Sequence, residues 1–479
     1  MPVPDVLIIG AGPAGLAAAR AARRVGAAVT LLDASDELGG QYWRHLPASR
    51  PAERENLLHH GWSTFTALRA ELEADTGCTI VRGANVWAIE TREGRPGAVF
   101  VVVGEPDGAN REQRVFEPDA LVIATGAYDR TLPFPGWELP GVFTAGAAQA
   151  LAKGERVAIG SRVLVAGAGP FLLPVAASLA ATGSTVVGVY EANRVKALMA
   201  GWLPKPWQVL RAAKKGGELG GYVLNHLQHR IPYRLGTAVV RAEGTDRVES
   251  VTLASVDALW APIPGTERTV AVDAVCVGHG FTPRLELAIA AGCALDGDDF
   301  VGVDEQQQTS IPSVYAAGEI TGIGGVDAAL AEGEIAGHVA AGGSVLDAAL
   351  RPAVAHRRTY RSFGRRIEDA HGVRAGWRGW LTDDTVVCRC EEVTYGALRG
   401  AATATGGESL RSIKLASRAG LGICQGRVCG RTVEDVLDSL SPGHSDGPRS
   451  AAEDRVRTDR RPIALPLRLG ELADEPTLS

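Results

Sequence analysis

The sequence lacks the marks of several protein classes. Its net charge of −6 and isoelectric point near 6.0 give no basic excess, so the composition does not indicate nucleic acid as a partner. Its seven cysteines include no Cys-x-x-Cys pair, which excludes a redox-active disulfide of the thioredoxin type. Its ten histidines form no His-Glu-x-x-His pattern, and no acid–base pair stands out. We therefore predict no catalytic residue in this chain.

The distribution of apolar and charged residues also predicts neither a targeting segment nor a membrane span. The apolar N-terminal stretch has no basic region before it and is interrupted by glycines. Residues Val163–Tyr190 contain no charge and are long enough to cross a bilayer. Glycines and prolines divide that stretch into strand, turn, helix, turn and strand, so we expect no transmembrane segment.

Glycine is abundant, at 59 of 479 residues. One glycine cluster near the N-terminus lies between a predicted strand and a predicted helix. The apolar run Asp5–Ile9 predicts a buried parallel strand, Leu16–Val25 a helix and Ala28–Leu32 a second strand. The glycine-rich turn between the first strand and the helix completes a βαβ nucleotide-binding unit. Its candidate cofactor-binding residues are Gly10, Ala11, Gly12, Pro13, Ala14, Gly15 and Asp33.

Each part of this turn has a physical role in nucleotide binding. Gly10 permits the tight turn, Gly12 lets the backbone approach a pyrophosphate, and Gly15 lets helix and strand pack closely. The helix N-terminus presents unpaired N–H groups to the phosphates. Asp33, at the end of the second strand, is placed to accept a hydrogen bond from a ribose hydroxyl.

A similar unit recurs at residues 162–191. It predicts a strand at Val163–Ala166, a helix at Phe171–Thr182 and a strand at Thr185–Tyr190. Leu172 occupies the third glycine position, so the fingerprint is incomplete. This leaves open an NAD(P) site, a structural duplicate or a site for another nucleotide. The candidate residues of this second nucleotide site are Gly167, Gly169 and Glu191.

Two further segments, Leu121–Gly126 and Val314–Glu319, each form a strand ending in a glycine turn. With the first turn, they resemble the separated motifs of the flavoproteins that have two dinucleotide-binding domains. The resemblance implies bound FAD and a contact of Glu319, which replaces the usual Asp, with the ribityl chain. It adds the candidate FAD contacts Gly40, Gln41, Val86, Thr125, Gly126, Gly318 and Glu319.

Four cysteines near the C-terminus form a distinct constellation. A Cys-x-Cys pair, Cys388 and Cys390, is followed after a long gap by Cys424 and Cys429. This spacing suits a [2Fe-2S] cluster held by four thiolates better than the paired Cys-x-x-Cys knuckles of zinc ribbons. Zinc and plain buried thiols remain the alternatives at this point. Neighbouring glycines would let backbone N–H groups point toward cluster sulfur.

The segments Cys388–Val393 and Arg418–Gly430 resemble the bacterioferritin-associated-ferredoxin (BFD) type of [2Fe-2S] domain. More closely, they resemble this domain fused to a flavoprotein in the alpha (A) subunits of heteromeric amino-acid dehydrogenases, among them opine oxidases, hydrogen cyanide synthase and proline or hydroxyproline dehydrogenases. Pro133–Trp137, Thr144–Ala150 and Gly322–Gly325 agree with this family.

The resemblance implies an α/β fold with two Rossmann-like dinucleotide-binding domains, of the FAD/NAD(P)-disulfide-oxidoreductase kind, plus a small helical BFD-like domain. The expected domains are an FAD-binding domain at 1–128 and 281–345, a second NAD(P)-type domain at 129–280, a basic helical connector at 346–380, the [2Fe-2S] domain at 381–440 and a partly disordered tail at 441–479. Eight arginines lie in Arg351–Arg378. We interpret them as a solvated helix whose arginines cover apolar surface, the alternatives being a face for an acidic partner or for RNA.

The implied function is electron transfer. The chain would take electrons from an FAD-containing, amine-oxidase-like beta subunit and pass them through flavin and [2Fe-2S] cluster to an external acceptor. A small [2Fe-2S] ferredoxin-like protein is a further expected partner, and an FMN at a subunit interface or an adenine nucleotide in the second domain are further expected ligands. The expected location is the cytoplasm, at the inner face of the membrane. The alternatives are a stand-alone FAD-dependent NAD(P)H:acceptor oxidoreductase and a scaffold that holds only an adenine nucleotide.

Overall fold

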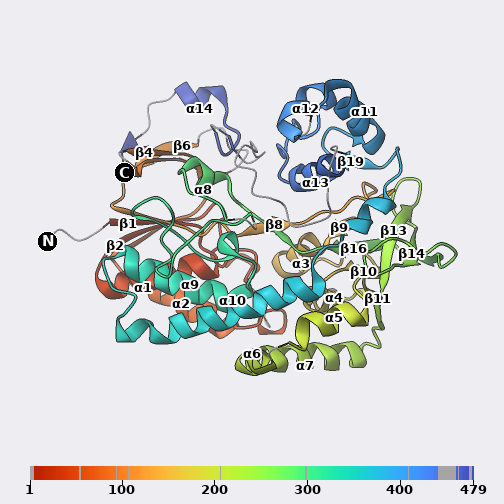
Figure 1. Ribbon diagram of the computed structural model, residues 1–479. Helices are drawn as coiled ribbons and strands as arrows, with labels where there is room; N and C mark the ends of the chain where they lie inside the picture. Colours follow the sequence, from red (N-terminus) through yellow and green to blue (C-terminus); the bar gives the residue numbers. More distant parts are fainter. Residues whose placement is uncertain are drawn as a thin grey trace. The chain divides into compact units, whose positions relative to one another are not determined.

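The computed structural model describes residues 5–52, 55–92, 94–105, 108, 111–204, 206–296, 299–407, 409–440, 460–461, 463–473 and 477–478. It divides into two compact units, which Figure 1 draws in sequence colours. Unit 1 comprises Met1–Ala127, Pro283–Gly364 and Asp459–Ser479, and unit 2 comprises Tyr128–Thr282 and Arg365–Thr458. The finer domain boundaries expected from the sequence stay a prediction. Residues 441–459 of the tail that was expected to be partly disordered lie outside the described residues.

Unit 1 is built on a parallel five-stranded sheet in the order β18-β7-β1-β2-β3 and a second sheet in the order β21-β6-β5-β4. Its strands are β1 (Asp5–Ile9), β2 (Ala28–Leu32), β3 (Cys78–Val81), β4 (Ala84–Arg92), β5 (Arg95–Val103), β6 (Glu112–Phe116), β7 (Ala120–Ile123), β18 (Val314–Ala316) and β21 (Thr477–Leu478). Its helices are α1 (Pro13–Val25), α2 (Trp62–Ala74), α8 (Glu286–Ala290), α9 (Gly325–Ala340) and α14 (Leu469–Ala473), with short 3-10 turns η1 (Glu55–Leu57), η2 (Glu319–Thr321) and η3 (Ala348–Leu350).

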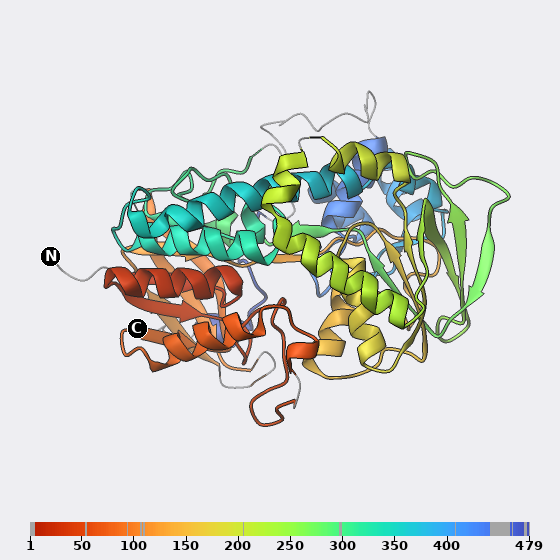
Figure 2. The same cartoon turned by 90° about the horizontal axis from the view of Figure 1, so that it is seen from below.

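Helices α1 and α9 lie side by side in unit 1 (Figure 2). Their close approach depends on two glycines of α9. A Cβ atom on Gly333 would lie 2.0 Å from the carbonyl oxygen of Ala14, and one on Gly337 would lie 2.0 Å from that of Ala18. Because only a residue without a side chain fits there, α9 holds the first turns of α1 against the sheet. The N-terminus of α1 is thereby fixed in position.

Unit 2 contains a second parallel sheet in the order β12-β11-β10-β16-β9 and an antiparallel sheet β13-β14-β15. Its strands are β9 (Val142–Thr144), β10 (Arg162–Gly167), β11 (Thr185–Glu191), β12 (Tyr233–Leu235), β13 (Thr237–Glu243), β14 (Ser250–Ser255), β15 (Arg268–Ala271), β16 (Ala274–Gly278), β19 (Val386–Cys388) and β20 (Val393–Thr394). Its helical segments are α3 (Ala145–Gly154), α4 (Leu172–Ala181), α5 (Val195–Trp202), α6 (Pro206–Arg211), α7 (Ala213–Gln228), η4 (Ala375–Trp380), α11 (Tyr395–Thr405), α12 (Leu410–Ser417) and α13 (Gly430–Leu440). Strands β8 (Ala127–Asp129) and β17 (Phe281–Pro283) lie where the chain passes between the units.

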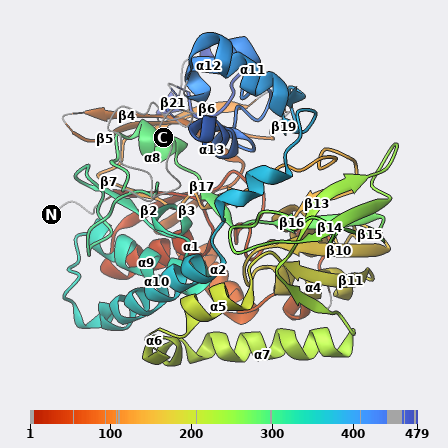
Figure 3. The same ribbon diagram turned by 45° about the vertical axis from the view of Figure 1, so that its right-hand side comes forward.

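The cysteine-bearing segment of unit 2 is a small helical domain, in which α11, α12 and α13 gather beside β19 (Figure 3). Its core is continuous with that of the neighbouring dinucleotide-type sheet. The indole N–H of Trp137 donates to the carbonyl oxygen of Val386 at 2.5 Å, and the Thr131 hydroxyl donates to that of Val428 at 2.8 Å. These bonds fix the cysteine loops to the segment that precedes α3.

The expected connector, 346–380, contains the long helix α10 (Arg351–His371) between the 3-10 segments η3 and η4. The interpretation of its arginines as solvated is wrong for Arg357 and Arg366, which are 6% and 5% exposed. Arg357 donates to the Gln307 side chain at 3.0 Å, and Arg366 donates to backbone carbonyls that include Gly201 at 3.1 Å. A buried guanidinium needs such partners, because leaving its N–H groups unpaired is costly. These arginines therefore serve internal packing.

The first helix begins at Pro13, three residues before the predicted Leu16, because proline fits the first turn of a helix. Strands β1 and β2 begin and end as predicted. Helix α4 is one residue shorter than predicted at each end, and β11 is one residue longer at its C-terminal end. Cys276 in β16 is fully buried and packs in the core of its sheet. Within the described ranges, no helix combines the length and hydropathy that a bilayer crossing requires.

Candidate functional site

The first glycine turn forms an open cradle at the N-terminus of α1. Gly12 is its N-cap residue, and no side chain caps the helix. A Cβ on Gly15 would lie 1.7 Å from the carbonyl oxygen of Gly10, so only glycine lets the helix begin this close to the strand. The amides of Ala14 and Gly15 belong to the first turn of the helix and have no intrahelical acceptor. They are available to a phosphate group, which the helix dipole also favours.

Asp33 closes the cradle on the side of β2. Its carboxylate accepts hydrogen bonds from the backbone N–H groups of Ala11 at 2.5 Å and Ser35 at 2.8 Å. Burial raises the pKa of Asp33, and these two N–H groups oppose the rise. The carboxylate thus fixes the turn, and its contact with a ribose hydroxyl stays a prediction.

The residues around the cradle fit the adenosine diphosphate part of FAD. A Cβ on Gly12 would have only the Gly40 Cα within 4 Å, at 3.9 Å, and one on Gly40 would lie 2.9 Å from the Gly12 Cα. The Gly12 and Gly40 backbones therefore approach each other closely, and Gly12 keeps the backbone of the turn free of a side chain. Gln41 is exposed, and its side-chain oxygen accepts a hydrogen bond from Nε of Arg44 at 3.1 Å. The remaining predicted contacts in this region are Val86, Thr125 and Gly126. Val86 is buried in β4, the Thr125 hydroxyl donates to the Arg284 carbonyl oxygen, and Gly126 has a positive φ.

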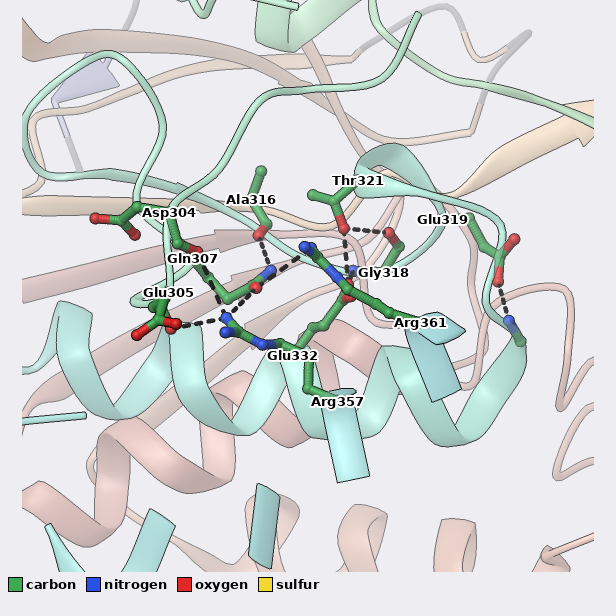
Figure 4. A network of polar contacts seen from close by, with 11 residues as sticks. Asp304, Glu305, Gln307, Ala316, Gly318, Glu319, Thr321, Glu332, Arg357 and Arg361 are labelled. Atoms are coloured by element: carbon green, nitrogen blue, oxygen red, sulfur yellow. Dashed lines mark hydrogen bonds and ion pairs between the residues drawn. The ribbon is translucent and has the colours of Figure 1, made fainter. Parts of the chain in front are cut away.

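The turn after β18 is held by a network that the sequence analysis missed (Figure 4). One oxygen of Glu332 accepts from the Gly318 N–H at 2.9 Å and from the Thr321 hydroxyl at 2.7 Å. The other oxygen accepts from Nε of Arg361 at 2.7 Å. The only signal in the sequence was an acidic residue on the otherwise small and apolar face of α9.

Glu319, predicted to face the ribityl chain, follows Gly318 in this turn. Its carboxylate accepts from the Gly325 N–H at 2.9 Å, at the start of α9. Burial raises the pKa of Glu319 to about 7; the Gly325 N–H opposes this rise, and the nearby Glu332 carboxylate adds to it. A carboxyl group poised in this way can donate or accept a hydrogen bond toward a hydroxyl.

The second glycine turn is closed by protein groups. Ala168 N–H donates to Gly278, and the amides of Leu172 and Leu173 donate to Gly169 and Pro170. None of these N–H groups points to a free position. Gly278 makes room for the Leu172 side chain, because a Cβ there would lie 3.3 Å from the leucine Cδ2.

Glu191, the predicted ribose acceptor of this unit, is 0% exposed. Its carboxylate accepts from the Gly169 N–H at 2.8 Å and from the Asn193 side chain at 2.9 Å. The Tyr233 hydroxyl donates to it at 3.3 Å, and Nδ1 of His371, at the end of α10, lies 3.4 Å away. The carboxylate has no exposed face left for a ribose.

The four predicted cluster cysteines are brought together in the helical domain. Thiol hydrogen bonds link Cys429 to Cys388 and to Cys424, and link Cys424 to Cys390. Cys388 and Cys429 are buried, whereas Cys390 is exposed. A Cβ on Gly422 would lie 2.3 Å from the Cβ of Cys390, so glycine is needed where the two cysteine loops meet.

Backbone amides point toward the sulfur atoms. Gly420 and Glu391 donate to Cys388, and Gly426 and Val428 donate to Cys424. The thiol of Cys429 is the largest cause that lowers the pKa of Cys388 to about 6 and that of Cys424 to about 4, and these amides add to the effect. The same neighbouring thiols raise the pKa of Cys429, and burial raises that of Cys390. Because four thiols and several backbone N–H donors gather here, the donor set fits a [2Fe-2S] cluster, which binds them as thiolates.

Within the described residues, no three His, Cys, Asp or Glu side chains are arranged to hold one metal ion. In a [2Fe-2S] cluster each iron takes only two protein thiolates, the remaining ligands being inorganic sulfide.

Comparisons with known proteins find matches over the two regions that contain these sites. Residues 4–333 match the family described as pyridine nucleotide-disulphide oxidoreductase, and residues 386–439 match the BFD-like [2Fe-2S] binding domain. The A subunit of opine oxidase from Agrobacterium tumefaciens (strain Ach5) is 32% identical, with 98% of this chain and 92% of the relative covered. The HcnB subunit of hydrogen cyanide synthase from Pseudomonas aeruginosa is 33% identical, with 92% and 94% covered. The crystal structure of L-proline dehydrogenase from P. horikoshii has the same fold, with a TM-score of 0.68 at 21% identity and with 98% of this chain and 80% of that chain covered.

Proposed function

Because the chain belongs to the pyridine nucleotide-disulphide oxidoreductase family, as a relative of HcnB and of the A subunit of opine oxidase with a BFD-like [2Fe-2S] domain, we propose that it is the electron-transferring alpha subunit of a heteromeric amino-acid dehydrogenase. The family confirms the predicted cofactors, FAD and a [2Fe-2S] cluster, and the predicted class, an FAD-dependent oxidoreductase. The relatives are named as subunits, so a partner chain is implied.

One observation carries the proposal: the same chain holds an open flavin cradle and a four-thiol site. A flavin exchanges two electrons and an iron–sulfur cluster exchanges one, so together they connect a two-electron donor to a one-electron acceptor. In this chain the turn at Gly10–Gly15 and Asp33 would hold the FAD, and Cys388, Cys390, Cys424 and Cys429 would hold the iron atoms. The sequence pattern predicts no acid–base pair for amine oxidation in this chain, which favours a separate subunit for that step.

The proposed partner is an FAD-containing, amine-oxidase-like beta subunit, and a small [2Fe-2S] ferredoxin-like protein is a further proposed component. The beta subunit would oxidise the amine, and electrons would leave this chain for an external acceptor. The proposal also places the complex in the cytoplasm, at the inner face of the membrane, which cell fractionation can check.

The test is co-expression with an amine-oxidase-like flavoprotein encoded beside this chain. Anaerobic addition of a panel of amino acids and opines should bleach the flavin of this chain only when the partner is present. A dye that accepts one electron should then be reduced by the complex and not by either protein on its own. Amine-driven bleaching of this chain without a partner would contradict the proposed division of labour.

A further inference from the structure

The second cysteine loop and the helix before it carry charge of one sign. Residues 411–430 include Arg411, Lys414, Arg418 and Arg427 and no acidic residue, although the whole chain has a net charge of −6. A reduced [2Fe-2S] cluster with four thiolates is itself negative, so nearby cations could simply offset its charge. The contacts of these four residues show which of them are engaged inside the domain and which are not.

Two of the cations are engaged inside the domain. Nε of Arg418 lies 2.7 Å from the Glu391 carboxylate, and Arg427 donates to the Cys424 carbonyl at 3.4 Å. Arg411 and Lys414 differ, because no ion pair within the described residues involves them. Arg411 is exposed and Lys414 is half-buried on α12.

Three apolar side chains are exposed on α12 and on the cysteine loop that follows it. Leu415 is 81% exposed and lies on the same side of α12 as Arg411 and Lys414, since residues three and four apart share a helix face. Ile423, directly before the cluster ligand Cys424, is 89% exposed, and Leu421 is 39% exposed. We call Arg411, Lys414, Leu415, Leu421 and Ile423 the α12 face.

The exposure of these apolar residues does not result from a poorly packed helix. The opposite side of α12, Leu410 and Ile413, is buried in the domain core with Leu398 and Val433. Cys390, one of the four thiols, is exposed beside this loop. An electron carrier bound here would therefore approach the cluster at its exposed side, and electron transfer requires such a short approach.

We infer that the α12 face is the docking surface for an acidic electron-carrier protein that contacts it through apolar residues around its own redox centre. This inference rests on the proposed function. Redox partners bind through small interfaces, with an apolar centre and complementary charges that steer association. One electron passes from the reduced cluster, which returns to its oxidised level, to the metal centre of the carrier; no bond or proton changes.

The test uses the full-length holoprotein and plant plastocyanin, an acidic blue-copper protein with an apolar surface at its metal. Binding is measured with both proteins redox-inactive: the oxidised chain is titrated into 15N-labelled, zinc-substituted plastocyanin at low ionic strength, and line broadening is followed. Electron transfer is measured separately by mixing photoreduced chain with copper plastocyanin. Mitochondrial cytochrome c, a basic acceptor, is the comparison probe.

Two variants alter the α12 face by different means. The double variant Arg411→Glu/Lys414→Glu should lower the second-order rate with plastocyanin about tenfold or more and remove its salt dependence. Ile423→Ser should weaken binding several-fold while the salt dependence remains. The matched controls are Arg241→Glu and Leu224→Ser, exposed residues of the same kinds elsewhere in unit 2, which should leave both values unchanged. Iron and sulfide content is measured for every variant, so that loss of the cluster is not read as loss of docking.

Different results separate the inference from the proposed function. If photoreduction places no electron on the cluster, the proposed function fails. If the cluster is reduced but both α12-face variants bind and transfer like the wild type, the docking surface is wrong and the proposed function stands. Tighter binding of cytochrome c than of plastocyanin would also overturn the docking surface. Loss of the beta subunit on purification of Ile423→Ser, with plastocyanin binding unchanged, would assign this face to a subunit interface instead.

Discussion

At the scale of single residues, the cysteine site depends on one small residue that binds nothing. Gly422 lies where the two cysteine loops meet, with a hypothetical Cβ 2.3 Å from that of Cys390. Its φ is not positive, so alanine would fit the backbone and fail only through this contact.

We therefore expect Gly422→Ala to lose most of its cluster while it keeps its flavin. Overpacking of a fixed loop costs about 1–3 kcal/mol, and here it separates thiolates that must share a cluster. Iron, acid-labile sulfide and flavin are measured on anaerobically purified protein. Gly400→Ala is the matched control, because a Cβ at this position of α11 would meet nothing within 4 Å. Full iron content in Gly422→Ala would contradict the proposed loop geometry.

His279 gives a pH dependence to unit 2. It is 5% exposed and lies against the rings of Trp260 and Trp380, and its Nδ1 has no hydrogen-bond partner among the described residues. Burial lowers the pKa of His279 to about 3, and the Arg130 charge adds to this. Since the unfolded chain binds a proton near pH 6.5 and the folded chain does not, this contribution to stability is complete above pH 6.5 and is lost as the pH falls toward 3.

We expect the free energy of unfolding of unit 2 to fall by about 2 kcal/mol between pH 6.5 and pH 5 on account of this residue. Urea unfolding followed by tryptophan fluorescence measures the slope. His279→Asn should be less stable at neutral pH and should have a flatter profile over this interval. An unchanged slope in the variant would mean that another group titrates.

At the scale of elements, the two βαβ units look alike in sequence but differ in what their turns leave free. In the first unit α1 starts at Pro13 and presents open amides, whereas in the second unit α4 starts at Leu172 after its amides have been used in backbone bonds. The Glu191 carboxylate is likewise occupied by hydrogen bonds from other groups of the protein. A missing third glycine was the one visible sign of this difference.

We accordingly expect neither NADH nor NADPH to bleach the flavin when mixed anaerobically with the purified chain. The physical reason is that the Leu172 and Leu173 amides of the second turn are used in backbone hydrogen bonds, and that the buried Glu191 offers no exposed carboxylate to a ribose. Absorbance near 450 nm is followed for several minutes, and dithionite, added last, shows that the flavin can be reduced. Rapid bleaching that saturates with nucleotide concentration would favour the stand-alone reductase instead.

The sequence predicted those elements whose signals are local. The run Asp5–Ile9 and the Cys-x-Cys pair carry their meaning within a few residues, so the strand and the thiol site could be located. The Glu332–Arg361 pair and the burial of Glu191 by His371 join residues far apart in the chain, and no periodicity marks them. They could only be found once the fold had brought the segments together.

At the scale of the whole molecule, the described tail returns to unit 1. Strand β21 pairs with β6, and the Glu471 carboxylate lies 2.6 Å from the Arg111 guanidinium, which is largely buried. The Ala464 N–H donates to the Trp87 carbonyl at 2.7 Å. The tail therefore supplies an edge strand and an ion-pair partner to the sheet that contains Val86.

Deleting residues 462–479 should thus destabilise the flavin-binding unit and spare the cluster. The truncated chain exposes the β6 edge and leaves Arg111 without its carboxylate, which is costly for a buried charge. We expect flavin release at a lower temperature, measured by flavin fluorescence on heating, with iron content unchanged. Glu471→Gln, which keeps the strand and removes only the charge, should lie between the truncated and full-length chains.

The return of the tail has a consequence for how the two redox groups stay together. The cluster-bearing domain is an insertion in the chain, tethered to the flavin-binding unit through α10 on one side and through the segment that leads to β21 on the other. Severing either tether alone would leave the domain covalently attached through the other. The pairing of one flavin with one iron–sulfur centre is therefore independent of protein concentration, and dilution cannot separate them.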